Sequence, residues 1–545
     1  MSVFIGYPSF MAYQMMKGKK DNNDGFPSIP GMIARYSASG LTNEQMAANP
    51  VWVDKTGNGH DLQMKNFAWG GMSGVGGYEM NFNLWTNNVL SIPDISMSMT
   101  TTSVSVSVGN STYNNNLIYI HIINWDINKN HWLKVTSTYE DGDLVFKFYN
   151  DNHSKNIELP ANGYVNIPAY PEFKGNYMYI STTSNKQGSF TIEQLPLYPG
   201  ALVFDGVDDY GTCDNFPILT KEKGYTVVAL RSYLAESIGY LVYNGTSAKQ
   251  SAFAFERSDS LDTWSWGKNS SIRNSLPKLM SYQTSNSYNN NPISTGEVVE
   301  SNNIINVAYR GGYCNVAIWE LVFLDHDATE EELTKIKDYF VKTYPWLFPD
   351  QAWTVVGKTN EDEDRATIAN ITGNGNDLVL SNFGFAGGSG YNEEGEYAGY
   401  LVTDGVDDKA VSKQFKFGKN FTVILDFKFP VKKISYCGFD LSSKVRIQNL
   451  QGSGVYVVLK GNKTLIPSNV VRAVTSEGKV YDENWNEYNI VPGNISSNYT
   501  MVNLGFDGSN QFAESATKLA GIYSSTLSKD DCIKAYNYLQ TLKAK

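Results

Sequence analysis

Six aspartates stand in two identical pentapeptides, DGVDD, and could bind a divalent cation. The first pentapeptide spans 205–209 and the second spans 404–408. Hard cations such as calcium prefer several carboxylate oxygens gathered on one turn. An Asp-Gly pair is equally a turn signal, and aspartate side chains cap turns without any metal. The sequence therefore leaves two interpretations open, calcium ligands or turn caps of a protein without a cofactor, for Asp205, Asp208, Asp209, Asp404, Asp407 and Asp408.

The residue types that carry out hydrolysis occur without the spacing that catalysis needs. A glucanase strand carries Glu-x-Asp-x-Glu, which places a nucleophile and an acid on one face. The nearest string, EDED at 361–364, has another order and lies in a polar stretch. The chain contains no Gly-x-Ser-x-Gly elbow, and its five histidines form no His-x-x-x-His or Glu-x-x-His pair. We therefore predict that the protein has no catalytic residues and is not an enzyme.

Aromatic side chains in polar stretches could stack on sugar rings, with nearby Asn and Asp forming hydrogen bonds to the sugar. Such Ser- and Asn-rich stretches occur in both halves of the chain. The alternative for each ring is packing inside a β-sandwich. The candidate glycan-binding residues are Trp264, Trp266, Tyr282, Tyr288, Trp485 and Tyr488.

Charge and composition exclude several partners. The formal net charge is −11, which disfavours binding to nucleic acid or to an anionic membrane. No apolar stretch is long enough to span a bilayer, and no basic segment precedes an apolar run at the start, so we expect neither a membrane segment nor a secretion signal. Four cysteines without metal-like spacing favour free, buried thiols over disulfides.

The elements that must position these residues come from a duplicated domain. The segment TGNGHDLQMKNFAWGGMSG at 56–74 returns as TGNGNDLVLSNFGFAGGSG at 372–390, with eleven of nineteen positions identical at an offset of 316. The DGVDD pair has an offset of only 199, so the first copy contains an insertion of 117 residues. Self-similarity at a fixed offset indicates two copies of one domain.

Four parts follow from the duplication and the insertion. We expect an N-terminal arm, a first domain in two segments, an inserted β-domain and a second copy of the first domain. Their ranges are 1–30, 31–84 with 200–346, 85–199, and 351–545.

The pattern within these parts is typical of β-sandwiches. Segments such as SVSVSV (103–108), YTVVALRSYL (225–234) and NVAIWELVFL (315–324) alternate at period two or form apolar runs between turns. Asp141-Gly142 predicts a hairpin within 131–151 of the inserted domain.

Each copy ends in a predicted helix. Thr329 and Ser528 are the expected N-caps, because acidic first turns and an apolar stripe follow each of them. The stripes comprise Leu333, Ile336, Tyr339 and Phe340 in the first copy, and Ile533, Tyr536 and Leu539 in the second.

Residues 1–30 combine aromatic side chains with a polar stretch rich in Gly and Pro. An extended arm of this kind has apolar groups to bury and little of its own to bury them against, whereas the alternative is an unstructured terminus. The arm is predicted to dock on a partner through Phe4, Tyr7, Phe10 and Tyr13.

The motif FDGVDDY at 204–210, followed by an alternating strand, a closing strand and a short helix, resembles the laminin-G-like branch of the concanavalin A-like jelly rolls. The resemblance covers both copies and implies an all-β protein with two jelly-roll sandwiches, the first interrupted by the inserted β-domain. In the second copy Thr403 and Lys409 replace the Phe and Tyr of the motif.

The recurrent TGNG…NF block and the tandem copies are similar to virion proteins of tailed phages that infect gut Bacteroidetes, including crAss-like phages. This resemblance implies a structural protein of a tail or fibre appendage, made in the bacterial cytoplasm and located in the virion. It further implies contacts with other virion proteins through the arm, binding to a host-surface glycan or receptor, and a homo-oligomer. The alternatives are a glycan-active enzyme on the same fold and a purely structural collar or capsid decoration protein.

Overall fold

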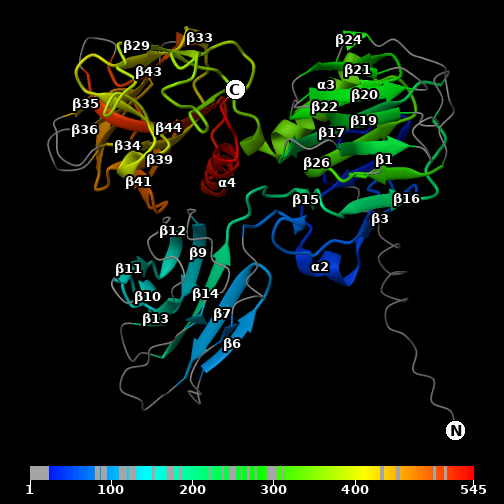
Figure 1. Ribbon diagram of the computed structural model, residues 1–545, viewed down its shortest axis with the longest axis horizontal. Coiled ribbons are helices and arrows are strands. Elements are labelled where there is room, and N and C mark those ends of the chain that lie inside the picture. Colours follow the sequence, from blue (N-terminus) through cyan, green and yellow to red (C-terminus); the bar gives the residue numbers. More distant parts are fainter. Residues whose placement is uncertain are drawn as a thin grey trace. The chain divides into compact units, whose positions relative to one another are not determined.

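The computed structural model describes the chain from residue 24 onward, with gaps. The described ranges are 24–79, 86–87, 95–109, 120–121, 131–149, 154–167, 177–182, 187–219, 223–235, 239–244, 253–258, 261–266, 271–275, 279–289, 291–292, 303–309, 312–429, 435–442, 444–449, 455–494, 499–507 and 512–544. The protein is all-β, and its described strands form several layered sheets (Figure 1). The chain divides into two compact units, Met1–Gly77 with Gly200–Thr343 and Tyr78–Pro199 with Tyr344–Lys545.

The first sandwich consists of two eight-stranded sheets. One sheet has the order β24-β23-β22-β17-β26-β15-β4, and β1 also pairs with β26. The strands of this sheet are β1 (Met32–Ser37), β4 (Gly74–Val75), β15 (Leu202–Asp205), β17 (Thr226–Tyr233), β22 (Met280–Thr284), β23 (Ser287–Tyr288), β24 (Asn291–Pro292) and β26 (Asn315–Leu324).

The opposing sheet has the order β2-β3-β16-β25-β18-β19-β20-β21. Apolar side chains from both sheets, including Trp52, Val227, Val307 and Phe323, form one buried core. The strands are β2 (Val51–Trp52), β3 (Leu62–Lys65), β16 (Tyr210–Cys213), β18 (Gly239–Asn244), β19 (Phe253–Ser258), β20 (Leu261–Trp266), β21 (Ser271–Ser275) and β25 (Ile305–Val307).

The second sandwich repeats this topology strand for strand around β44 (Glu514–Tyr523). Its first sheet runs β30-β31-β44-β34-β39-β40-β41 with β27 on β44, and its second runs β28-β29-β32-β43-β35-β36-β37-β38. The strands are β27 (Gln351–Thr354), β28 (Thr367–Ile368), β29 (Leu378–Ser381), β30 (Gly390–Asn392), β31 (Tyr400–Asp404), β32 (Lys409–Val411), β34 (Thr422–Lys428), β35 (Ser435–Leu441), β36 (Val445–Asn449), β37 (Val455–Leu459), β38 (Asn462–Ile466), β39 (Val470–Thr475), β40 (Lys479–Tyr481), β41 (Glu487–Asn489) and β43 (Val502–Leu504), and β33 (Phe415–Lys416) pairs separately with β42 (Tyr499–Thr500).

The inserted domain has a buried core of its own between a five-stranded sheet, β12-β9-β14-β7-β6, and a three-stranded sheet, β11-β10-β13. A pair of short strands, β5 with β8, completes its described elements. The strands are β5 (Thr86–Asn87), β6 (Ile95–Met99), β7 (Ser103–Val108), β8 (Ile120–His121), β9 (His131–Ser137), β10 (Leu144–Tyr149), β11 (Ser154–Leu159), β12 (Asn162–Ile167), β13 (Tyr177–Thr182) and β14 (Gly188–Gln194).

The hairpin predicted at Asp141-Gly142 is wrong. β9 pairs with β12 and β14, whereas β10 pairs with β11 and β13. The turn therefore carries the chain from one sheet to the other. Both strands place apolar side chains such as Leu133 and Phe146 in the core between the sheets, and this burial outweighs the local preference of Asp-Gly for a tight hairpin.

Helices close both sandwiches as predicted. The first is α3 (Glu330–Thr343), where Thr329 Oγ1 accepts a hydrogen bond from the backbone of Glu332 and the Glu332 carboxylate accepts one from Thr329 N. This reciprocal pair is a capping box. In α4 (Lys529–Gln540), Ser528 caps the backbone N–H of Asp531 at 3.1 Å.

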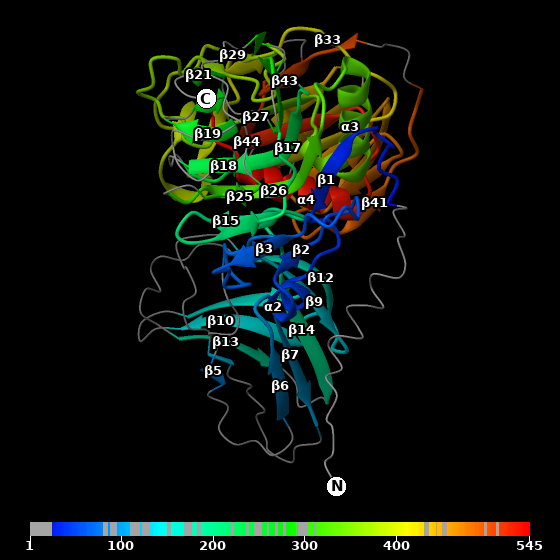
Figure 2. The same ribbon diagram turned by 90° about the vertical axis from the view of Figure 1, so that its right-hand side faces the viewer.

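Figure 2 shows α3 beside β1 in the first sandwich. The predicted stripes are buried, except for Leu333, which is partly exposed. A shorter helix, α2 (Asn43–Ala48), lies near the start of the first sandwich, and two single 3-10 turns are η3 (Pro345–Leu347) and η4 (Gly395–Tyr397). No helix in the described part of the chain is long and apolar enough to cross a membrane.

Candidate functional site

The first DGVDD pentapeptide forms a tight turn between β15 and β16. The Oδ1 atom of Asp205 accepts hydrogen bonds from the backbone N–H groups of Val207 at 2.7 Å and Asp208 at 3.3 Å. Asp209 closes the turn, because its Oδ2 accepts from Asp205 N at 3.0 Å. Gly206 has φ +76°, and a Cβ atom there would lie 2.7 Å from the Cβ of Asn315, so the turn requires glycine.

A second repeated motif holds this turn in place. Ser73 Oγ donates to Asp209 Oδ1 at 3.0 Å and accepts from Ala68 N at 2.8 Å. Asn66 Nδ2 donates to the backbone oxygen of Asp208 at 3.0 Å. The NF…SG block and the DGVDD block, which are far apart in the sequence, therefore build one hydrogen-bonded corner of the sandwich, which we call the corner motif.

The second sandwich contains the same corner motif. Ser389 Oγ donates to Asp408 Oδ1 at 3.0 Å, Asp404 N donates to Asp408 Oδ2 at 2.9 Å, and Asn382 Nδ2 donates to Asp407 O at 3.0 Å. Sequence reasoning singled out the aspartates and missed their Ser and Asn partners. The signal was present, because both partners are identical in the two repeated blocks.

The three carboxylates of each corner converge, and their ligand atoms lie within 4.8 Å of one another. Both oxygens of Asp209 already accept hydrogen bonds, as does Oδ1 of Asp205. This leaves Asp205 Oδ2 and the exposed carboxylate of Asp208 for a cation that prefers six to eight oxygens. Turn capping accounts for the conserved geometry of the corners, and calcium binding stays a prediction.

Burial raises the pKa of Asp209 to about 7, against the opposing effect of its hydrogen bonds from Asp205 and Ser73. The pKa of Asp408 is raised in the same direction and for the same first reason, burial. Nearby carboxylates add to both shifts, Asp205 and Asp208 in the first corner and Asp404 and Asp407 in the second. Asp209 and Asp408 thus resist ionisation, which suits a structural role more than the role of a permanently charged nucleophile.

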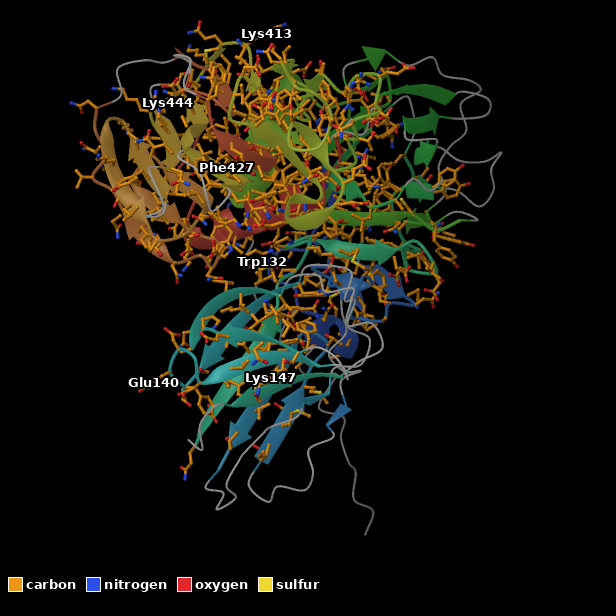
Figure 3. All side chains as sticks on the ribbon, turned by 60° about the vertical axis from the view of Figure 1, so that its left-hand side comes forward. Trp132, Glu140, Lys147, Lys413, Phe427 and Lys444 are labelled. Atoms are coloured by element: carbon orange, nitrogen blue, oxygen red, sulfur yellow. The ribbon has the colours of Figure 1, made fainter. Side chains whose placement is uncertain are left out.

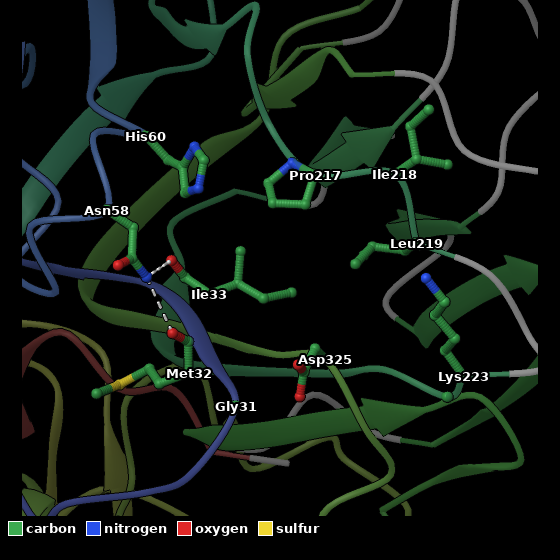
Figure 4. A pocket seen from close by; sticks show the side chains of 11 residues that line it. Gly31, Met32, Ile33, Asn58, His60, Pro217, Ile218, Leu219, Lys223 and Asp325 are labelled. Carbon is green, nitrogen blue, oxygen red and sulfur yellow. Dashed lines mark hydrogen bonds between the residues drawn. The ribbon is translucent and has the colours of Figure 1, made fainter.

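The TGNG turn of the first copy borders a cavity of about 370 Å³ (Figure 4). Asn58 Nδ2 donates to the backbone oxygens of Met32 at 3.1 Å and Ile33 at 2.8 Å, which ties the turn to β1. His60 also lines the cavity, and its Nδ1 is buried without a hydrogen-bond partner in the described structure. The opposite wall contains Ile218, which is 54% exposed, so the cavity combines an apolar wall with a polar one.

The six predicted glycan-binding aromatics are distributed over both sandwiches, and those with described side chains differ in burial. Trp264 and Trp266 lie in β20, but their side chains lie outside the described residues. Tyr282 in β22 is partly exposed. Tyr288 is only 3% exposed and belongs to the core of the first sandwich.

In the second sandwich, Trp485 is fully buried and packs against Tyr481 and Tyr536 at ring-centroid distances of 6.0 and 5.8 Å. Tyr488 is partly exposed, and its hydroxyl donates to Asp482 at 3.0 Å. A buried ring cannot stack on a sugar from solvent. The prediction is therefore corrected for Tyr288 and Trp485, and it stays a prediction for the other four residues.

The docking residues predicted in the arm, Phe4, Tyr7, Phe10 and Tyr13, lie outside the described residues. The arm's last described part is fixed on the first sandwich. Asp24 accepts a hydrogen bond from Arg35 Nη1 at 2.7 Å, and the ring of Phe26 lies 4.0 Å from the guanidinium carbon of Arg35.

Each sandwich buries one carboxylate against one arginine beneath its closing helix. In the first, Arg35 donates to Glu320 at 3.1 and 3.3 Å and to the Tyr339 hydroxyl at 2.8 Å. In the second, Arg472 donates to Asp426. Burial alone would raise the pKa of Asp426, but the charge of Arg472 holds that pKa below its usual value. Paired in this way, these acids are poor candidates for proton transfer.

The inserted domain and the second sandwich share a contact at this buried pair. Trp132 of β9 meets the ring of Tyr536 edge-on at 5.8 Å, and its ring lies 5.9 Å from the guanidinium carbon of Arg472. Figure 3 labels Trp132 among the side chains of this unit. The four cysteines, Cys213, Cys314, Cys437 and Cys532, are buried and form no disulfide in the described part of the chain.

Comparison with known proteins identifies no family. No protein-family model matches the chain, and no curated protein matches it. Among solved structures, the chain is similar to a Trypanosoma rangeli sialidase in complex with sialic acid, with 9% identity and a TM-score of 0.26 over 82% of this chain and 83% of that one. A structure described as a receptor binding domain matches 59% of this chain and 89% of its own length, with 12% identity and a TM-score of 0.22. Both structures are too distant to indicate an activity for this chain.

Proposed function

We propose that this protein is a non-enzymatic structural component of a phage tail or fibre appendage, whose sandwiches bind glycan on the host surface. The observation that carries the proposal is the corner motif, which keeps the same hydrogen bonds in both copies while the side chains around it differ. A rigid scaffold that displays variable groups is typical of binding modules. The resemblance of the repeated blocks to phage virion proteins supplies the biological setting.

The hydrogen bonds and ion pairs of the buried acidic side chains support a non-catalytic function. The corner carboxylates Asp209 and Asp408 cap turns, and Glu320 and Asp426 pair with arginines. A glycosidase of the usual kind needs two carboxyl groups facing one substrate bond. These buried acids are committed to other partners within the fold.

The proposal includes the remaining parts of the chain. The arm docks on neighbouring virion proteins, and identical copies of the chain assemble as a homo-oligomer within the particle. Calcium at the corner motifs belongs to the same proposal as an optional ligand. A glycan-active enzyme and a purely structural collar or capsid decoration protein are the alternatives that the experiments must separate.

Location on the particle tests the virion role. Purified phage particles are labelled with antibody raised against the second sandwich and viewed by electron microscopy. We expect labels on the tail or its fibres. Labels around the neck or capsid would favour the collar or decoration protein, and particles that lack the protein would refute the virion role.

Sugar release tests the non-enzymatic part. The purified chain is incubated with polysaccharide from the host surface, and reducing ends are measured over time. We expect no increase above the buffer control. A steady increase that scales with protein concentration would establish the glycan-active enzyme instead.

A further inference from the structure

Three tyrosines gather beside the corner motif of the first sandwich. Tyr210 follows the DGVDD turn, and Tyr309 and Tyr313 flank the loop after β25 and form an isolated β-bridge with each other. The ring centroids of Tyr309 and Tyr313 are 5.0 Å apart, and that of Tyr210 lies 5.2 Å from the Tyr309 centroid and 6.4 Å from the Tyr313 centroid. We call this group the tyrosine platform.

The platform is part of the surface and not of the core. All three side chains are partly exposed, and none belongs to the buried core of the sandwich. In the described structure none of the three hydroxyls has a hydrogen-bond partner. Such hydroxyls remain available to a ligand while the rings offer apolar faces.

The spacing of the rings decides which ligands can bind. A cage for a quaternary ammonium group surrounds the cation with ring faces, so its rings must stand apart by more than the width of the cation. Centroids 5.0 and 5.2 Å apart, with interplanar angles of 33° and 39°, mean that the tyrosines already pack against one another. The rings therefore form an open platform, which suits a flat ligand that stacks from outside.

A hydrogen-bond acceptor stands at the edge of the platform. The Asp208 side chain is exposed, and no partner for its carboxylate occurs among the described residues. Asp208 lies two residues before Tyr210 at the end of the DGVDD turn, and burial, Tyr309 and then the charge of Asp208 raise the pKa of Tyr313. Hydrogen bonds with Asp205 and Asn66 fix the backbone of Asp208 before any ligand arrives, so only its side chain must be ordered on binding.

The second sandwich provides an internal comparison. Phe506 and Phe512 form the corresponding isolated bridge, with centroids 6.0 Å apart, and Lys409 takes the place of Tyr210 with its ammonium 5.7 Å from the Phe506 ring. The loop enters through Gly505 at φ +80° where the first sandwich has Ala308 at φ +62°. The backbones thus agree, and the second copy lacks all three hydroxyls.

We propose that the tyrosine platform, with Asp208 at its edge, is a binding subsite for a neutral pyranose residue of a polysaccharide, and that the second sandwich has no such subsite. The proposal rests on the glycan-binding function above. One face of a pyranose ring carries C–H groups that stack on an aromatic ring, and its hydroxyls donate to a carboxylate and to tyrosine oxygens. The charge of Asp208 disfavours acidic sugars at the same place.

Affinity electrophoresis of the full-length chain tests the subsite. Native gels contain dextran, mannan, xylan, galactan or host-surface polysaccharide as neutral probes, and hyaluronan as an acidic probe. The test variant Y210K/Y309F/Y313F gives the first sandwich the residue types of the second. The control variant F506A/F512A changes the second sandwich alone. Thermal unfolding of each variant verifies that it folds.

We expect at least one neutral polysaccharide to retard the wild-type chain and the control variant. For the test variant we expect the association constant to fall at least about tenfold, since the ring of Tyr210 and the hydrogen bonds of the three hydroxyls are lost. Equal retardation of the test variant and the wild type would overturn the platform but leave glycan binding elsewhere. Failure of every polysaccharide to retard the wild type would overturn both the platform and the glycan-binding function.

Discussion

Asp209 and Asp408 are candidate calcium ligands by sequence, and in the fold they stabilise their turns by accepting hydrogen bonds. Each accepts a hydrogen bond from a serine hydroxyl and another from the first residue of its own turn. Both are buried. A carboxylate that satisfies two donors in a buried corner contributes to stability through hydrogen bonds that water cannot replace.

Burial of Asp209 predicts a pH-dependent stability of the first corner. Its pKa is raised to about 7 in the folded protein, so the native state holds the proton more tightly than the unfolded state. The associated stability is fully present below about pH 4, its ordinary pKa. It is lost as the pH rises through about 7, a decrease on the order of 4 kcal/mol.

Hydrogen exchange of peptides covering β15 and β16, corrected for intrinsic rates, measures this decrease. Asp209→Asn cannot titrate and should show a flatter dependence between about pH 4 and pH 7. Asp408→Asn, which changes the other corner, is the matched control and should retain the wild-type slope at β15 and β16. Parallel slopes for wild type and Asp209→Asn would contradict the predicted shift.

Calcium should have little effect on stability. Only Asp205 Oδ2 and the Asp208 carboxylate lack donors in the first corner, and so few oxygens bind calcium weakly. We expect the melting temperature to be the same in EDTA and in excess calcium. A rise with calcium that Asp208→Asn abolishes would instead establish the aspartates as ligands.

At the scale of elements, the two sandwiches place their buried ion pair on different strands. Leu230 of β17 lies opposite Glu320 of β26, and in the second copy Asp426 of β34 lies opposite Leu519 of β44. The carboxylate has thus moved across the same strand pair. Its arginine has moved as well, from β1 to β39. Each sandwich thus keeps one buried ion pair beneath its closing helix, and either of the two paired strands can supply the carboxylate.

Removing one partner of the Arg35–Glu320 ion pair should lower the free energy of unfolding strongly, whereas replacing both partners should lower it little. In the second copy, Ala352 and Leu519 occupy the ladder positions that correspond to Arg35 and Glu320. Arg35→Ala leaves Glu320 buried without its cation and should destabilise the first sandwich by about 3–5 kcal/mol.

The double variant Arg35→Ala/Glu320→Leu should recover most of that loss, because it exchanges an ion pair for apolar packing. Urea unfolding followed by hydrogen exchange in α3 and β26 measures both variants. Equal destabilisation by the single and double variants would contradict the argument, since the orphaned charge would then not be the cause.

The sequence predicted the elements whose cause is local and missed those whose cause is tertiary. Thr329 and Ser528 cap their helices because the acidic first turns and apolar stripes beside them suffice. Trp485 stands in the polar stretch DENWNE and was a candidate for glycan binding, with packing inside the sandwich as the alternative. Its left-handed backbone, φ +60°, and the hydrogen bonds that Asp482 accepts from Asn484 and Asn486 place its ring in the interior.

The candidate site, too, was predictable from the sequence only where its cause is local. The DGVDD turns could be predicted from their residues, but their Ser and Asn partners lie 136 and 142 residues away in the first copy. The tyrosine platform joins Tyr210 to a loop about a hundred residues later in the chain, and a β-sheet pairing brings them together. Only the pairing of β16 with β25 reveals it.

At the scale of the whole molecule, the two copies share the same scaffold but differ in the surface side chains beside the corner motif. The corner motif recurs in both sandwiches with equivalent hydrogen bonds, while its neighbours are tyrosines in one copy and phenylalanines with a lysine in the other. Under the function proposed above, the first copy contains a glycan-binding subsite that the second copy lacks.

The net charge of the chain predicts how salt affects glycan binding. With a formal charge of −11, the protein repels acidic polysaccharides at low ionic strength, and salt screens that repulsion as the Debye length falls from about 30 Å at 0.01 M to about 3 Å at 1 M. Stacking and hydrogen bonds to a neutral sugar contain no such long-range component. Retardation of the full-length chain by a neutral polysaccharide should therefore change by less than about twofold across this range. Any retardation by hyaluronan should increase with salt. If retardation by the neutral polysaccharide fell steeply with salt, ionic contacts would have to carry the binding, and the tyrosine platform could not be its main source.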